Sequence, residues 1–166
     1  LGGGMFSNGT PLTINGCTFN NNYAAGNGGG AIYSVGSYLS TINSTFYNND
    51  AIAGSGGAIF ASSPIYMKFT TVSADTASAE GGGVYVVSEN LVIQNCMLGN
   101  NTANGANNDY DDDQGVVNDL GYNIVEFFSG HDFSSETTNI TGQQANLFGA
   151  GISTQTLAYN GGPTHT

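Results

Sequence analysis

The feature that most constrains this chain is an internal repeat. A Gly-Gly step recurs in the first half of the sequence, and an apolar or aromatic pair follows it closely each time. The steps are marked by Gly3, Gly30, Gly57 and Gly82, and the pairs are Met5-Phe6, Ile32-Tyr33, Ile59-Phe60 and Val84-Tyr85. The intervals are 27, 27 and 25 residues. A fixed period in this range is typical of repeat architectures, in which each unit buries its apolar face against the next.

A second block of positions lines up independently of the glycines, with a period of 26 to 27 residues. Its columns are Leu12, Leu39, Ile65, Leu91; Ile14, Thr41, Met67, Ile93; Cys17, Ser44, Thr70, Cys96; Phe19, Phe46, Val72, Leu98; and Asn22, Asn49, Asp75, Asn101. One common register across all of these columns indicates that the repeats are equivalent in structure.

Within a repeat, apolar and polar residues alternate, as in Leu12-Thr13-Ile14-Asn15, which is typical of a strand with one buried face. Asn15-Gly16 then interrupts the alternation and indicates a corner. Each repeat is expected to hold two or three short strands that pair with their counterparts about 4.8 Å away. Parallel connections are overwhelmingly right-handed. The sequence therefore predicts an all-β, right-handed parallel β-helix (solenoid) of four clear coils plus an irregular C-terminal segment.

Composition agrees with strands and turns, because the chain has 26 Gly and only 8% charged residues. We expect the coils in residues 1–103, and in residues 104–166 an acidic loop, the final coil or coils, and a C-terminal capping or arm segment of the same domain. Leucine-rich repeats have similar periods and are the alternative, but these coils lack a dense Leu signature.

The repeated tetrapeptides also resemble a known family pattern. GGAI at 29–32 and 56–59, with FNNN at 19–22 and FYNN at 46–49, is similar to the GGA[ILV] and FxxN repeats of polymorphic outer membrane proteins and related bacterial and archaeal surface β-helix proteins. LGYNIVE at 120–126 and NGGPTHT at 160–166 resemble the closing segment of such chains. The third coil departs from the pattern at Val72 and Asp75. The resemblance implies an exterior location and an adhesive or scaffolding role, and it implies no catalytic residues.

Charge excludes several classes of partner. The net charge is −11, of which residues 80–166 carry −10, and Lys68 is the only Lys or Arg. Such a chain repels phosphate backbones and anionic lipids, so nucleic-acid binding is not expected. No apolar run approaches the roughly 20 residues of a membrane-spanning helix, so this segment is not expected to insert. Without a signal peptide or start Met, we interpret the sequence as a mature fragment.

Two columns yield structural expectations. Asn22, Asn49, Asp75 and Asn101 are expected to form a structural ladder at one corner, because Asn and Asp tolerate left-handed backbone and bond to neighbouring backbone groups. Cys17 and Cys96 share a column three coils apart, or about 14 Å. A disulfide needs Cα atoms within about 7 Å, so both are expected to be buried free thiols.

The acidic run Asp109-Tyr110-Asp111-Asp112-Asp113 offers oxygen ligands for calcium, but it fails the EF-hand template at Gln114 and Leu120. We interpret it as a solvated acidic turn and expect no metal or cofactor; calcium binding there is the alternative.

An enzyme is the main competing class. A lyase acting on acidic sugars needs a basic residue, and Lys68 alternates outward on its strand. A glycosidase needs only two carboxylates at the right separation, and the candidates are Glu80, Glu89, Glu126 and Glu136. No pair of them recurs so as to mark a cleft, and His131 and His165 are interpreted as surface residues. We expect no catalytic residues.

Asn-x-Ser/Thr sequons occur at Asn8, Asn43, Asn100 and Asn139, in a number that composition alone explains. Asn8 and Asn100 fall in expected turns and are the leading glycosylation candidates.

Two functions follow from these observations. The first is a secreted or cell-surface structural or adhesive module, such as a filament subunit that associates end to end or continues into a longer surface chain, with glycans as a further partner. Its ends differ, because the first coil begins at once while residues from about 130 onward form at best a partial cap. The alternative is a carbohydrate-binding or carbohydrate-cleaving β-helix that uses Tyr33, Phe60 and Tyr85.

Overall fold

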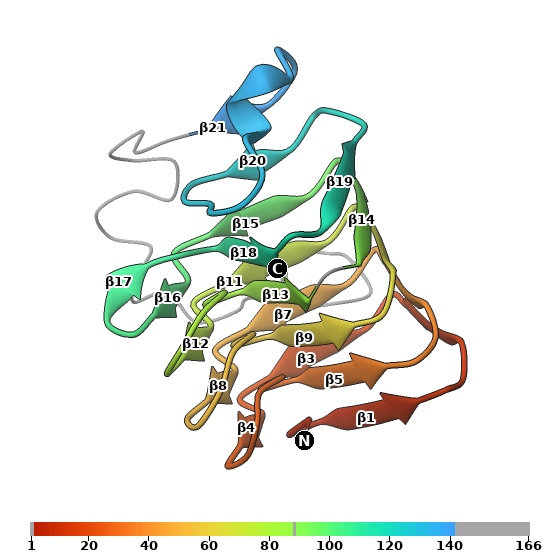
Figure 1. Cartoon of the computed structure of the whole chain (residues 1–166), viewed down its shortest axis with the longest axis vertical. Helices are drawn as coiled ribbons and strands as arrows, with labels where there is room; N and C mark the ends of the chain where they lie inside the picture. The colour runs from red at the N-terminus through yellow and green to blue at the C-terminus, as the bar shows by residue number, and fades with distance from the viewer. Residues whose placement is uncertain (1, 88, 142–166) are drawn as a thin grey trace.

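The computed structural model describes residues 2–87 and 89–141 and shows an all-β parallel solenoid of about five turns. The coils stack along the long axis of the molecule, with the first coil at one end and the last described strands at the other (Figure 1). The expected fold class, a stack of parallel coils, is therefore confirmed.

Four sheets run along the stack. Sheet A contains β1 (Met5–Asn8), β5 (Ile32–Val35), β9 (Ile59–Ser62), β13 (Val84–Val87) and β18 (Tyr110–Asp113). Sheet B contains β2 (Leu12–Asn15), β6 (Leu39–Ile42), β10 (Ile65–Lys68), β14 (Asn90–Gln94) and β19 (Val116–Asp119). Sheet C contains β3 (Thr18–Asn20), β7 (Thr45–Tyr47), β11 (Thr71–Ser73), β15 (Met97–Gly99), β20 (Ile124–Val125) and β21 (Ile140–Thr141). Sheet D contains β4 (Tyr23–Ala24), β8 (Asp50–Ala51), β12 (Thr76–Ala77), β16 (Thr102–Ala103) and β17 (Ala106–Asn107).

The register of the strands is the register of the sequence columns. Leu39 lies opposite Leu12 and Ile65 in sheet B, and Phe46 lies opposite Phe19 and Val72 in sheet C. All strand pairs are parallel except β16 with β17, which form an antiparallel pair. Equivalent residues therefore contact one another from coil to coil.

Each of the first four coils has a strand in all four sheets, so the expectation of two or three strands per coil was wrong. The missed element is the two-residue strand of sheet D. Its inward residue is alanine in the first four coils, and these residues are buried: Ala24, Ala51, Ala77 and Ala103. Alanine is a weak strand signal, but the column itself has the same period as the others and could have revealed the element.

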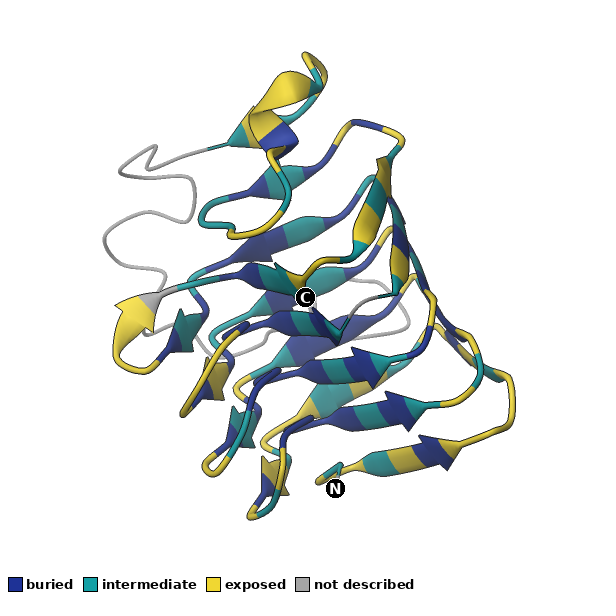
Figure 2. Ribbon diagram, viewed as in Figure 1, coloured by how far each residue is buried: buried dark blue, intermediate teal, exposed yellow. Residues whose placement is uncertain are grey.

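The core is a set of apolar columns between the sheets. Ile32, Leu39 and Phe46 are fully buried in the second coil, and their counterparts in the next two coils are buried as well. The rings of Phe19 and Phe46 stack with centroids 5.1 Å apart and planes at 9°. Figure 2 shows the buried residues concentrated in the middle coils, with exposed residues at the loops and at both ends.

The recurrent Gly-Gly step marks a corner where the backbones of adjacent coils touch. A Cβ on Gly30 would lie 2.0 Å from the carbonyl oxygen of Gly57, and a Cβ on Gly57 would lie 2.0 Å from that of Gly82. No side chain fits at such distances. The glycine repeat is therefore a packing requirement of the stack.

The acidic run is a strand, so the expectation of a solvated turn was wrong. Tyr110–Asp113 continues sheet A, where Tyr110 lies opposite Val84 and Asp111 opposite Tyr85. Tyr110 is fully buried, and its ring meets that of Phe133 edge-on at 5.3 Å. Pairing with β13 and burial of the tyrosine outweigh the low strand propensity of aspartate.

The C-terminal end of the described chain covers the last coil. A short 3₁₀ helix, η1 (Phe133–Ser135), begins after Asp132, whose carboxylate accepts a hydrogen bond from the Ser134 N–H. Phe133 is fully buried and also packs edge-on against Phe128. Residues 127–141 therefore act as a cap on the core at this end.

The glycine corner generates a stability prediction. Gly57→Ala should destabilise the fold by about 3 kcal/mol, because its Cβ meets a backbone oxygen that cannot move without shifting the next coil. Gly9→Ala is the control: a Cβ there has no atom within 4 Å, and only its left-handed φ of 71° opposes the change, at about 1 kcal/mol. Urea unfolding of both variants checks the order. Equal costs would contradict the packing explanation.

Candidate functional site

The Asn and Asp column forms a continuous hydrogen-bonded ladder inside one corner. The Asn22 side-chain and backbone N–H groups both donate to Asn49 Oδ1, at 2.8 and 3.1 Å. Asn49 donates in the same two ways to Asp75 Oδ1, at 2.8 and 2.7 Å. The Asp75 backbone N–H donates to Asn101 Oδ1 at 2.9 Å. The structure thus brings all four residues together, and the side chains of Asn49, Asp75 and Asn101 each accept from the coil before.

The left-handed backbone lies one residue earlier than expected. The residues with positive φ are those that precede the ladder positions, namely Asn21, Asn48, Ala74 and Asn100, with φ between 55° and 62°. Positive φ is not found at the ladder residues themselves. Their role is instead to satisfy buried backbone N–H groups, which would otherwise cost free energy.

Asp109 is a fifth ladder residue that the repeat did not reveal. Its Oδ1 accepts from the Asn101 side chain and backbone, at 2.8 and 2.9 Å, and its Oδ2 accepts from the Phe127 N–H at 2.8 Å. It follows Asn101 by only eight residues, because the chain turns back there through β16 and β17 instead of completing a 26-residue coil. A period of 26 to 27 residues cannot predict a contact between residues only eight positions apart.

Asp75 has a carboxyl group at a ladder position where the neighbouring coils have an amide that both accepts and donates hydrogen bonds. At the neighbouring positions the side-chain nitrogen also donates to a main-chain carbonyl: Asn49 to Phe19 at 3.2 Å, and Asn101 to Val72 at 3.0 Å. Asp75 is fully buried, and its Oδ2 has no hydrogen-bond partner among the described residues. A protonated carboxyl carries a donor on that oxygen, whereas a carboxylate carries none.

Burial raises the pKa of Asp75 to about 8; hydrogen bonds from Asn49 act against the shift, and the charge of Asp109 adds to it. Burial likewise raises the pKa of Asp109 to about 6, although three hydrogen bonds oppose that shift. Both groups hold a proton more readily in the folded chain than in the unfolded one. Both groups therefore make the stability of the fold depend on pH.

The rest of the acidic run is placed for hydrogen bonding within the protein. Asp112 Oδ2 accepts from the Tyr110 hydroxyl at 3.0 Å, and Asp111 Oδ2 accepts from the Asn108 side chain at 3.1 Å. Within residues 2–87 and 89–141, no group of three or more His, Cys, Asp or Glu side chains is positioned to hold a metal ion. The calcium hypothesis thus gains no observation from this part of the chain.

Both cysteines are free thiols, as expected from their separation along the stack. Cys96 is buried, and burial raises the pKa of its thiol to about 11, which makes it unreactive at neutral pH. Cys17 is only half-buried, so the expectation of burial was wrong for it. Cys17 precedes β3 in the first described coil, which pairs with a described coil on one side only.

The sequons fall in different environments. Asn8 and Asn43 are exposed, Asn100 is half-buried, and Asn139 is half-buried. The Asn139 side-chain nitrogen, to which a glycan would attach, donates to Asp119 and to the Phe133 carbonyl. Glycosylation of Asn139 would therefore break contacts that hold the cap, whereas Asn8 and Asn43 are open to modification.

The glutamates considered as catalytic carboxylates have different interaction partners. Glu126 accepts a hydrogen bond from the Asn100 backbone, and Glu136 accepts from the Thr138 hydroxyl. Glu80 interacts with Tyr85 on sheet A, and Glu89 is half-buried beside β14. His131 is half-buried against Phe133, with an Nε2 that lacks a partner among the described residues, and His165 lies outside them.

The aromatic residues of sheet A, Phe6, Tyr33, Phe60 and Tyr85, pack against one another from coil to coil. Tyr33 and Phe60 stack with centroids 4.5 Å apart and planes at 6°. Phe6 and Tyr85 continue the column at 5.8 and 5.6 Å with tilted rings. The facing surfaces of Tyr33 and Phe60 cover each other, so these two faces are not available to a ligand.

The ladder predicts how stability depends on pH. Ionisation of Asp75 favours the unfolded chain, where its pKa is near 3.8, so its contribution is fully present below about pH 4 and is lost as pH rises towards 8. The free energy of unfolding should fall between pH 5 and 8 by on the order of 1 kcal/mol per pH unit. Urea titrations across this range measure the slope.

Asp75→Asn should flatten that slope and stabilise the protein at pH 8 by about 2 kcal/mol or more, because the amide restores a donor and removes the charge. Asn49→Asp is the reverse change, which places a second carboxyl beside Asp75, and it should steepen the slope. A slope that Asp75→Asn leaves unchanged would refute this account of the ladder.

Comparison with protein-family models, curated proteins and solved structures finds no match for this chain. No helix in residues 2–87 and 89–141 has the length and apolarity needed to cross a bilayer. The strand pairing shows a β-solenoid. The likeness to polymorphic outer membrane proteins stays a prediction from the sequence, and its closing motif at 160–166 lies outside the described residues.

Proposed function

We propose that this chain is a structural or adhesive solenoid module that works outside the cell or at the cell surface, and that another coil stacks on its first coil. The added coil comes from a second copy of the chain or from a longer polypeptide. The proposed role is mechanical: it provides a stiff rod and requires no catalytic residues.

The observation that carries the proposal is the incomplete burial of the first coil. Met5, Leu12, Cys17 and Phe19 point toward the core but are only partly buried, whereas Ile32, Leu39 and Phe46 of the second coil have no exposed surface. Strands β1, β2, β3 and β4 are also the edge strands of their sheets. An apolar cross-section with unpaired strand edges favours addition of a further coil.

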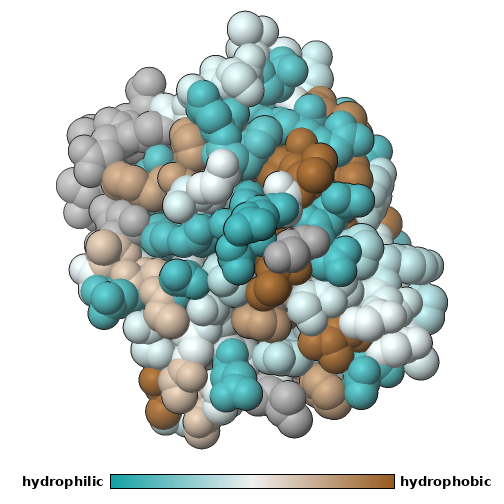
Figure 3. Space-filling view, in the orientation of Figure 1, coloured by the Kyte–Doolittle hydropathy of each residue, from teal (hydrophilic) through white to brown (hydrophobic). Residues whose placement is uncertain are grey.

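The two ends of the described chain differ, which favours head-to-tail contact. The opposite end carries η1 and the Phe133 cluster, while the first coil presents open strands (Figure 1). On the face drawn in Figure 3, apolar residues form separate small patches among polar ones. Lateral association through that face is therefore less favoured than stacking at the open coil.

An exterior location has indirect support. It comes from the family resemblance, and the exposed Asn8 and Asn43 are compatible with glycosylation there. The competing carbohydrate function through Tyr33, Phe60 and Tyr85 is weakened because Tyr33 and Phe60 stack on each other and Tyr85 packs against Phe60 with a tilted ring.

Assembly is testable with a charge in the open coil. The wild-type chain should associate as its concentration rises, and Leu12→Glu should remain monomeric, because stacking would bury an unpaired carboxylate. Sedimentation velocity over a concentration series and negative-stain electron microscopy report the outcome. Leu12 is partly exposed, so the variant should keep the fold, which circular dichroism checks.

Ile52→Glu is the control, since Ile52 is 44% exposed and belongs to the second coil. It should associate as the wild type does. A wild-type chain that stays monomeric at the highest concentrations would defeat self-stacking, and association that survives Leu12→Glu would place the contact elsewhere.

A further inference from the structure

At one corner of the solenoid, two coils carry an aromatic residue where the other coils carry Gly or Asn. The turn between sheets B and C places an equivalent residue of each coil at positive φ: Gly16, Asn43, Phe69, Asn95 and Tyr122, with φ of 63°, 48°, 49°, 53° and 59°. In the last of these turns Gly121 also has a positive φ, of 80°. Their equivalence is shown by a shared hydrogen bond, in which the N–H of each of the first four donates to the carbonyl just before the next member. Glycine and asparagine suit this backbone conformation, and large aromatic residues do not.

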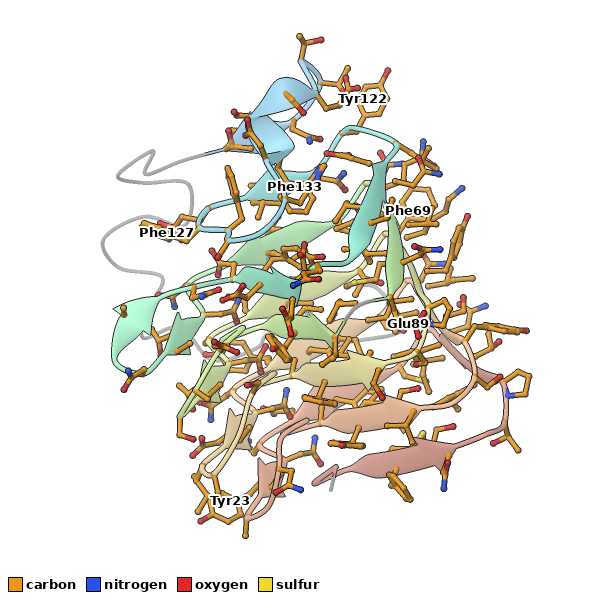
Figure 4. All side chains as sticks on the ribbon, in the orientation of Figure 1. Tyr23, Phe69, Glu89, Tyr122, Phe127 and Phe133 are labelled. Carbon is orange, nitrogen blue, oxygen red and sulfur yellow. The ribbon has the colours of Figure 1, made fainter. Side chains whose placement is uncertain are left out.

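Phe69 and Tyr122 are therefore strained and also poorly buried. Phe69 is 56% exposed and Tyr122 is 63% exposed, so core packing does not repay the strain. Figure 4 shows both side chains at the same margin of the molecule. Strained residues that gain no burial point to a function, because selection for stability alone would place Asn or Gly there.

The two aromatic residues flank a groove. They lie two coils apart, or about 10 Å along the stack, with Asn95 between them. The groove has a volume of about 290 Å³, and Thr71, Met97 and Ile124 of sheet C also line it. The side chains of Asn95 and Thr71 make no hydrogen bond with the described residues, so one amide and one hydroxyl are available to a ligand.

The chemistry of the groove selects its ligand. No charged side chain lines it, and a net charge of −11 disfavours anions. The Lys68 ammonium lies over the Tyr66 ring, at 5.4 Å from the centroid. Aromatic faces also bind cations, but the amide and the hydroxyl of this lining match a guest that itself carries several hydroxyl groups. A neutral sugar offers those hydroxyl groups together with weakly positive C–H faces for the aromatic rings.

We propose that this corner is a binding site for one or two units of a neutral saccharide, held between Phe69 and Tyr122 and hydrogen-bonded to Asn95 and Thr71. The volume is at the small end for ligand sites, which suits a short segment of sugar and not a folded partner. The site does not depend on stacking at the first coil, so either proposal can fail without the other.

The test uses the full chain at a concentration where sedimentation shows a monomer. Maltoheptaose, cellohexaose and mannohexaose are titrated by NMR, with the Phe69 and Tyr122 ring signals as reporters, and affinities are measured by calorimetry. At least one oligosaccharide should shift both sets of signals. Phe69→Asn and Tyr122→Asn should each weaken binding about tenfold, since each removes one stacking face.

The same two variants should unfold at an unchanged or higher temperature, because asparagine occupies this turn in other coils. Loss of binding without loss of stability separates a ligand site from a structural role. Tyr38→Asn is the control: Tyr38 is 49% exposed away from the groove, and its loss should leave binding unchanged.

Three results would overturn the proposal. The first is that none of the three oligosaccharides shifts the Phe69 and Tyr122 signals. The second is that binding survives in both asparagine variants. The third is that a proline-rich or arginine-rich peptide shifts these signals while the sugars do not, which would assign the groove to a peptide.

Discussion

In-register stacking of parallel strands is the constraint on which the rest of this structure depends. Each of the first four coils hydrogen-bonds to its neighbour along four sheets, so a strand residue there contacts its own counterpart one coil away. A favourable contact made once is then made at each coil, as in the apolar columns of sheets A, B and C. An unfavourable contact is repeated in the same way, which explains why Gly30 and Gly57 leave no room for a side chain.

Stacking also determines how buried polar groups are satisfied. A coil must turn corners, and each corner turns backbone N–H groups away from the strand ladders. The Asn ladder gives each of these groups an acceptor on the next coil, and Asp109 continues the series into the cap. Asp75 fits the geometry of the ladder but not its donor pattern, so proton binding couples to folding at that position.

Several features could be read from the sequence because they repeat. The columns of Leu39 and Phe46, the corner at Asn49 and the absence of a Cys17–Cys96 disulfide all follow from one period and the strand spacing. The sheet D strands were missed because two residues ending in alanine give a weak local signal. The acidic strand was missed because its partner in β13, and not its own composition, makes it extended.

The sequence by itself therefore determined the solenoid, its period and the identity of its interior columns, because periodicity is a property of the chain. The tertiary structure decided whatever depends on contact across unequal intervals. It places Asp109 eight residues after Asn101 on the same ladder, leaves the first coil half-buried, and sets Phe69 and Tyr122 on either side of one groove. These arrangements arise from distances in space between coils, and the order of residues along the chain does not contain those distances.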